Sequence, residues 1–170
     1  NDHDIELMGA SGCSVVHNTL SNLKLGSGVA PVRKLLDAGV TLGLGTDGLS
    51  SNDTARIFDV MRIAALVHNT PDPDPEKWLS AATILDAATL GGARTGMLEN
   101  DTGSLEVGKA ADLIMLDLSS YAFTPLNEIP KHLVYAENGS SIELVMVNGE
   151  IVLKDDQLQT VNEDEVLREI

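Results

Sequence analysis

The chain has 170 residues, 43% of them hydrophobic, which suits one globular domain with a small appendage. Its net charge of −15 at pH 7 argues against nucleic acids and anionic membranes as partners, because like charges repel. Cys13 is the single cysteine, which allows no intramolecular disulfide, and there is neither a signal peptide nor an apolar run of about 18 residues. We therefore expect a cytoplasmic protein without a membrane span.

The N-terminal part of the chain alternates between helical and extended patterns. Pro31 suits the first turn of a helix, where its missing N–H costs nothing, and Gly39 suits a left-handed helix end. A strand, a helix and a second strand with short connections predict two adjacent parallel strands. The elements expected are the end of a helix at 4–10, a strand at 13–17 that buries Cys13, a loop at 23–28, a helix at 30–38 and a strand at 40–44.

The middle of the chain has a helical pattern. Asn52 and Asp53 form an N-cap signal, and the apolar positions after them repeat with helical spacing. Arg62 lies within this pattern and is expected to form a structural ion pair. The elements expected are an amphipathic helix at 54–69, a rigid acidic linker at 71–75, a second helix at 76–90 and a short helical turn at 93–98.

The pattern changes again at Gly103. Asn148-Gly149 between two apolar runs is a strong signal for a β-hairpin. Residues 129–135 are ambiguous, with an extended conformation as one interpretation. The other elements expected are a strand at 113–117, hairpin strands at 142–147 and 150–153, and a charged terminal helix at 162–170. The domains predicted from these patterns are 1–102, 103–155 and 156–170.

One carboxylate stands out. The expected strand at 40–44 brings Asp47 just past its C-terminal end, where parallel α/β folds place their chemistry. Three hypotheses apply: a metal ligand or general base, a turn cap, and a dinucleotide site, since residues 43–48 match G-x-G-x-x-G. The dinucleotide hypothesis is disfavoured, because no second strand ending in an acidic residue follows and Asp47 would repel a pyrophosphate. Local pattern alone leaves the other two open.

Several separated motifs carry a family resemblance. His-Asn-Thr-Leu-Ser-Asn-Leu-Lys-Leu-Gly-Ser-Gly-Val-Ala-Pro at 17–31 and Leu-Gly-Thr-Asp-Gly at 44–48 are two of them. They are similar to the segments at barrel strands seven and eight of amidohydrolases. The closest group contains methylthioadenosine/S-adenosylhomocysteine deaminases and triazine chlorohydrolases. The resemblance covers nearly the whole chain and continues through residues 58–62, 88–94, 103–114 and 145–149.

The resemblance implies an α/β fold, namely a (β/α)₈ TIM-type barrel with a small β-sandwich. Residues 1–102 would supply the last two strand–helix units of the barrel, and residues 103–155 the C-terminal part of the sandwich. A whole barrel needs at least about 200 residues. The family's early His-x-His pair and its strand-five and strand-six histidines have no match here. We therefore expect the C-terminal portion of a longer enzyme, whose N-terminal barrel part completes the site.

The resemblance also implies roles for single residues. Asp47 matches the strand-eight aspartate, which binds the divalent metal and shuttles the proton of the attacking water. His17 matches a position that lines the pocket or supports it, rather than a metal ligand. Four residues are implied to line the pocket or hold its loops: Ser21, Asn22, Ser51 and Asn52. The other histidines lack ligand-like spacing and are expected at ordinary surface or helix-end positions: His3, His68 and His132.

The function implied is a metal-dependent hydrolase acting on carbon–nitrogen bonds of a cyclic amidine or purine-like ring, a deaminase with metal-activated water as nucleophile. Zinc is the expected metal, with iron and manganese as alternatives. The chlorohydrolase, guanine deaminase and imidazolonepropionase branches are alternative functions, as is a noncatalytic binding module. We expect a small-molecule substrate and leave a homo-oligomer open. The 170 residues alone are expected to be inactive and to bind zinc poorly, since catalytic zinc usually has three protein ligands.

Overall fold

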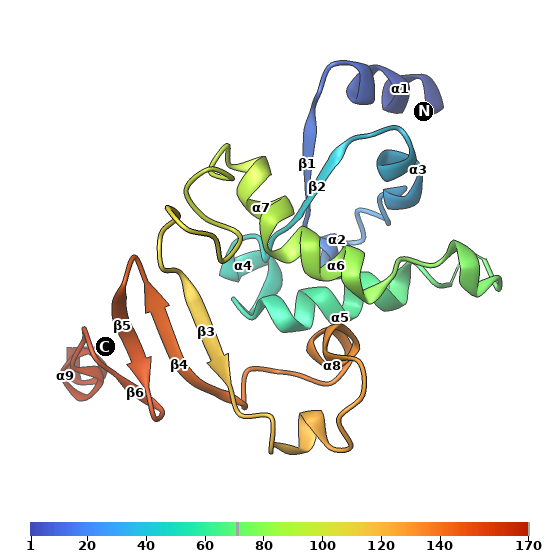
Figure 1. The fold of residues 1–170 in the computed structure, drawn as a ribbon. Helices are drawn as coiled ribbons and strands as arrows, with labels where there is room; N and C mark the ends of the chain where they lie inside the picture. The colour runs from blue at the N-terminus through green and yellow to red at the C-terminus, as the bar shows by residue number, and fades with distance from the viewer. Residues whose placement is uncertain (71, 170) are drawn as a thin grey trace.

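The structure, a computed structural model, describes residues 1–70 and 72–169 (Figure 1). Strands β1 (Ser14–His17) and β2 (Thr41–Leu44) lie side by side and parallel, with His17 opposite Leu44. This confirms the predicted parallel pair. The helices before and between these strands are α1 (Asp2–Ala10), α2 (Thr19–Leu25) and α3 (Val32–Asp37).

Two predictions for this region were wrong. The expected loop at 23–28 begins inside helix α2, which buries Thr19 and Ser21 and ends at Gly26 with a left-handed φ of 68°. Tertiary packing of a short helix outweighs its weak intrinsic propensity here. Cys13 is exposed and precedes β1. It lies in the turn between α1 and β1, where its Sγ is 3.0 Å from Ser11 Oγ.

The chain after β2 makes a short helix before its first long one. Helix α4 (Leu49–Asn52) ends at Asp53, whose φ of 63° is left-handed, and α5 (Ile57–Val67) starts after Arg56. The predicted helix start at Asn52 and Asp53 was therefore wrong. The Asn52 side chain bonds to loop carbonyls instead of capping α5. In Figure 1, α5 runs below α4 and the carboxyl end of β2.

The next helices form a layer against α5 and β2. Helix α6 (Ala81–Ala88) begins only where Ser80 accepts the Thr83 N–H, so the predicted start at residue 76 was too early. The other elements here are η1 (Pro75–Lys77) and α7 (Leu90–Thr95). The predicted linker at 71–75 begins at Pro71, which lies outside the described residues.

The core lies among β2, α5, α6 and a helix from much later in the chain. That helix, α8 (Ile129–Tyr135), replaces the extended interpretation of residues 129–135. It packs against α5 and α6 and buries Val134 completely. The β-branched Ile129 and Val134 favour strands locally, but contacts with the helical layer decide the conformation.

A second sheet is antiparallel, with the order β3-β4-β5-β6. The Asn148-Gly149 turn joins its two longest strands, which confirms the predicted hairpin. Its strands and neighbouring elements are β3 (Leu113–Leu116), η2 (Tyr121–Phe123), β4 (Ile142–Val147), β5 (Glu150–Lys154), β6 (Gln157–Leu158) and α9 (Glu163–Glu169). Ile170, the last residue of the predicted terminal helix, lies outside the described residues. Over the described ranges, no helix is long and apolar enough to cross a membrane.

Candidate active site

The carboxyl ends of β1 and β2 meet at one edge of the parallel pair. His17 ends β1 and Leu44 ends β2, directly opposite each other. Past these ends, the backbone N–H of Gly45 donates to the His17 carbonyl at 3.3 Å. A Cβ at Gly45 would force the side chains of Asn18 and Val16 to move, so glycine is favoured there. The loop that leaves β2 therefore starts tightly packed against the end of β1.

Asp47 lies in this loop with a left-handed φ of 62° and an exposed side chain. Ser21 Oγ donates to one carboxylate oxygen, Oδ2, at 2.5 Å, and the Gly48 N–H donates to the other, Oδ1, at 2.7 Å. The Ser21 bond, followed by the Gly48 bond, lowers the pKa of Asp47 below its ordinary value. The carboxylate is therefore ionised at neutral pH and held at both oxygens.

The remaining loop residues hold the backbone around Asp47. Asn52 is buried, and its Nδ2 donates to the carbonyls of Thr46 at 2.6 Å and Thr54 at 3.0 Å. Ser51 Oγ donates to the Gly48 carbonyl at 2.9 Å and is near enough to Asp47 to contribute to its lowered pKa. These two side chains fix the shape of the loop from inside.

The α2 residues expected at the site behave differently from each other. Ser21 is only 2% exposed and reaches Asp47 across 26 positions of sequence. Asn22 is half-buried, and its backbone carbonyl accepts the Ser27 N–H at 2.9 Å. Among the described residues, its side chain makes no hydrogen bond. The structure thus brings Ser21 to Asp47 and leaves Asn22 in the middle of α2 without such a contact.

The His17 side chain contacts His68, for which the sequence predicted no role in the site. Its ring is 3% exposed, and its Nε2 lies 3.1 Å from Nε2 of His68, just after α5. Burial, followed by the proximity of His68, lowers the pKa of His17 to about 4. Burial also lowers the pKa of His68. The helix-end position expected for His68 is observed, but no spacing pattern predicts a contact over 51 positions.

Among the described residues, Asp47 is the candidate for a ligand position of a metal site. None of their His, Cys, Asp and Glu side chains gather in groups of three or more that could hold a metal ion. Asp47 is a single ionised oxygen donor, which suits zinc and other divalent metals. His132 does not add to it, because its two ring nitrogens bond to the Ala122 carbonyl and the Asn127 N–H.

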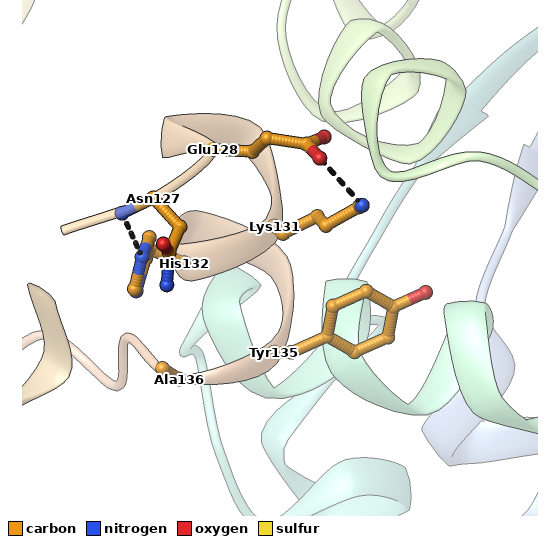
Figure 2. A pocket seen from close by; sticks show the side chains of 6 residues that line it. All are labelled: Asn127, Glu128, Lys131, His132, Tyr135 and Ala136. Atoms are coloured by element: carbon orange, nitrogen blue, oxygen red, sulfur yellow. Dashed lines mark hydrogen bonds and ion pairs between the residues drawn. The ribbon is translucent and has the colours of Figure 1, made fainter. Parts of the chain in front are cut away.

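Two hollows lie near α5 and α8. One, of about 480 Å³, lies along α8 (Figure 2), where Lys131 pairs with Glu128 and His132 bonds to Asn127. Four of its six lining residues thus bond in pairs, far in sequence from Asp47. The other, of about 300 Å³, adjoins the Asp47 loop and is lined by Leu20, Asn52, Thr54, Asp59, Arg62 and Ile63.

Arg62, expected in an ion pair, donates instead to the Glu137 carbonyl at 3.4 Å. No ion pair of Arg62 is found in residues 1–70 and 72–169. Glu137 is itself fully buried, and its Oε1 accepts the backbone N–H groups of Asn138 and Gly139. The contact therefore joins α5 to the loop that follows α8.

Residues 1–152 match the amidohydrolase family, and the chain belongs to that family. It is 40% identical over 169 residues to 5′-deoxyadenosine deaminase of Methanosarcina barkeri, covering 99% of this chain and 38% of the relative. It is 41% identical over 170 residues to 5-methylthioadenosine/S-adenosylhomocysteine deaminase 1 of Syntrophus aciditrophicus, covering 100% of this chain and 38% of the relative. The chain thus spans well under half the length of these curated relatives.

Solved structures agree with this assignment. An adenosine deaminase from Xanthomonas campestris with bound zinc superposes with a TM-score of 0.94 at 38% identity, covering 99% of this chain and 38% of that one. Atrazine chlorohydrolase from Arthrobacter aurescens, complexed with zinc, gives a TM-score of 0.93 at 32% identity, with 99% and 37% covered. The α/β fold is therefore that of the C-terminal portion of amidohydrolase barrel proteins, as expected.

Proposed function

We propose that the full-length protein is a metal-dependent aminohydrolase that removes an amino group from a purine-like ring. The observation that carries the proposal is the Asp47 carboxylate at the end of β2, ionised and held at both oxygens by Ser21 and Gly48. Membership of the amidohydrolase family supports a hydrolytic role for this carboxylate. The names of the relatives support a 5′-modified adenosine as substrate.

Asp47 is proposed to bind the metal and to move a proton. A divalent metal, when bound, lowers the pKa of a water from about 15.7 to about 7. Ionised Asp47 can accept the proton of the attacking water and donate it to the leaving amine. Ser21 restricts the carboxylate to one orientation, which spares the cost of ordering it during the reaction. Zinc is the proposed metal, supported by the zinc in the two similar structures.

The other site residues are proposed to shape the pocket. Ser51 and Asn52 hold the loop from inside, and Asn22 and His17 belong to the segments that border it. The remaining metal ligands are proposed to come from parts of the full-length protein beyond these 170 residues, because Asp47 alone offers one donor. Likeness to atrazine chlorohydrolase supports a second candidate, displacement of chloride from a triazine ring.

The test is an assay of the purified full-length protein for zinc content and for ammonia release from 5′-deoxyadenosine and 5′-methylthioadenosine, with chloride release from atrazine as the second arm. Asp47→Asn keeps the shape of the side chain and removes its charge. Asp53→Asn is the matched control, since Asp53 is also exposed with a left-handed φ in the same loop. Ammonia release that depends on Asp47 and not on Asp53 is expected. Equal activity of both variants would reject the assigned role.

A further inference from the structure

The contact between His17 and His68 joins the end of β1 to the end of α5. The two Nε2 atoms are 3.1 Å apart and the ring planes are tilted by 48°. A hydrogen bond between two Nε2 atoms requires one ring to donate a proton from that atom and the other to accept there. The accepting ring is therefore neutral and carries its proton on Nδ1, and the donating ring is either neutral or protonated.

Burial decides this charge state. His68 is the C-cap of α5, where the helix dipole favours a protonated ring. Desolvation nevertheless lowers the pKa of both rings, which favours two neutral imidazoles. If either ring were replaced by an apolar side chain, the other would keep a buried polar nitrogen without a partner. The hydrogen bond therefore links β1 to α5, and an apolar substitution of either histidine is unfavourable.

His17 has a second contact, through its backbone. Its carbonyl accepts the Gly45 N–H at 3.3 Å, two positions before Asp47 in the chain. The side chain of Asn18, the next residue, packs closely against Gly45, so a Cβ there would force it to move. The position of His17 thus determines where the Asp47 loop begins.

Helix α5 faces the same loop from the other side. Asp59, Arg62 and Ile63 of α5 line the 300 Å³ hollow together with Asn52 and Thr54 of the loop. Asn52 is also the residue that bonds to the Thr46 carbonyl, next to Asp47. A shift of α5 would therefore change the surroundings of Asn52, the side chain that shapes the loop.

We propose that His17 and His68 are positioning residues, whose hydrogen bond sets helix α5 and the Asp47 loop in one relative placement. This inference rests on the proposed function for its catalytic readout. Because Asp47 is proposed to act in proton transfer, misplacing it affects the transition state more than substrate binding. Loss of the bond is expected to lower kcat about ten- to hundredfold and to change KM by less than about threefold.

The experiment uses three variants of the full-length protein. His68→Leu removes the bond, and His68→Gln keeps a side-chain amide that can bond to His17 Nε2. Ile84→Val is the control: Ile84 is fully buried on α6, so this substitution destabilises the core and leaves the hydrogen bond between the histidines in place. For each variant kcat and KM are measured, and hydrogen exchange is followed by mass spectrometry in peptides that contain Gly45 and Gly48.

The expected result is lower kcat and faster exchange at Gly45 and Gly48 in His68→Leu, recovery of both in His68→Gln, and neither effect in Ile84→Val. The inference is overturned if His68→Leu exchanges like Ile84→Val in these peptides, or if His68→Gln loses as much kcat as His68→Leu. His17→Gln provides the same comparison from the other ring if His68→Leu does not fold. Absence of ammonia release by the unmutated protein would reject the proposed function alone, since exchange still reports the placement of the loop.

Discussion

The two sheets of this molecule differ in what holds them together. Strands β1 and β2 are parallel, are separated by helices α2 and α3, and bury Leu42 and Leu44 beside the helical layer. Strands β3 to β6 are antiparallel neighbours, and none of their residues is fully buried. The parallel pair thus depends on contacts between distant parts of the chain, whereas the hairpin is joined locally.

That difference explains where chemistry can be placed. Because the ends of β1 and β2 meet at one edge, Ser21 after one strand reaches Asp47 after the other. The corresponding turn of the hairpin, Asn148-Gly149, joins two strands that are neighbours in sequence. The Asn148 N–H does bond to Asp112, which fixes the turn to the start of β3. The distant contact at the parallel edge thus holds the candidate catalytic carboxylate, whereas the distant contact at the hairpin holds a turn.

The largest effect should come from removing the carboxylate at the parallel edge. Asp47→Ala in the full-length protein is expected to lower turnover by about three orders of magnitude or more, since metal binding and proton transfer are both lost. Its circular dichroism spectrum and unfolding midpoint should remain close to those of the unmutated protein. Glu150→Ala in the hairpin is the matched control and should leave turnover unchanged. Near-normal turnover of Asp47→Ala at saturating zinc would contradict the proposal.

The two regions should also differ in sensitivity to truncation of apolar side chains. Ile84→Ala in α6 removes a completely buried side chain and is expected to lower the free energy of unfolding by about 2–5 kcal/mol. Val145→Ala in β4 removes a half-buried one and should cost about 1 kcal/mol. Urea unfolding of both variants measures the difference. Equal losses would mean that the second sheet shares the same packed core.

The histidine pair, which lies in the parallel region, predicts that the free energy of unfolding depends on pH. The pKa of His17 is about 4 in the folded chain against an ordinary value of 6.5, so the unfolded chain binds more protons between these values. The free energy of unfolding is therefore at its full value above pH 6.5. It falls as the pH drops toward 4, by about 3 kcal/mol in total. Urea unfolding at several pH values measures this slope. The double variant His17→Gln, His68→Gln should flatten it, and an unchanged slope would assign it to other groups.

The smallest expected effect is at the hairpin turn. Gly149 has a φ of 81°, a left-handed conformation that other residues adopt only with strain. Gly149→Ala should cost about 1 kcal/mol of unfolding free energy and leave turnover unchanged. Thermal unfolding together with the ammonia assay checks both statements. A loss of turnover would show that the two regions are coupled more strongly than their separate sheets suggest.

Much of the arrangement could be predicted from residues that act locally. The apolar run before Asp47 marked β2, and Asn148-Gly149 marked the hairpin. What failed depended on contacts across the chain. Helix α8 forms because Val134 packs on α5 and α6, and the partner of His17 lies 51 positions away. The hydrogen bond from Ser21 to Asp47 likewise could not be predicted from the sequence, because it forms only when the ends of two strands lie side by side.

The left-handed backbone at Asp47 limits how this position could change during evolution. Asparagine and aspartate are the side-chain-bearing residues that adopt such a φ most readily, and only aspartate carries a charge. Glutamate would add a methylene between backbone and carboxylate and would fit this conformation less well. If the loop sequence changes, aspartate is therefore the acidic residue that suits this position. The left-handed backbone thus favours asparagine or aspartate at position 47, and the proposed reaction requires the charge that aspartate carries.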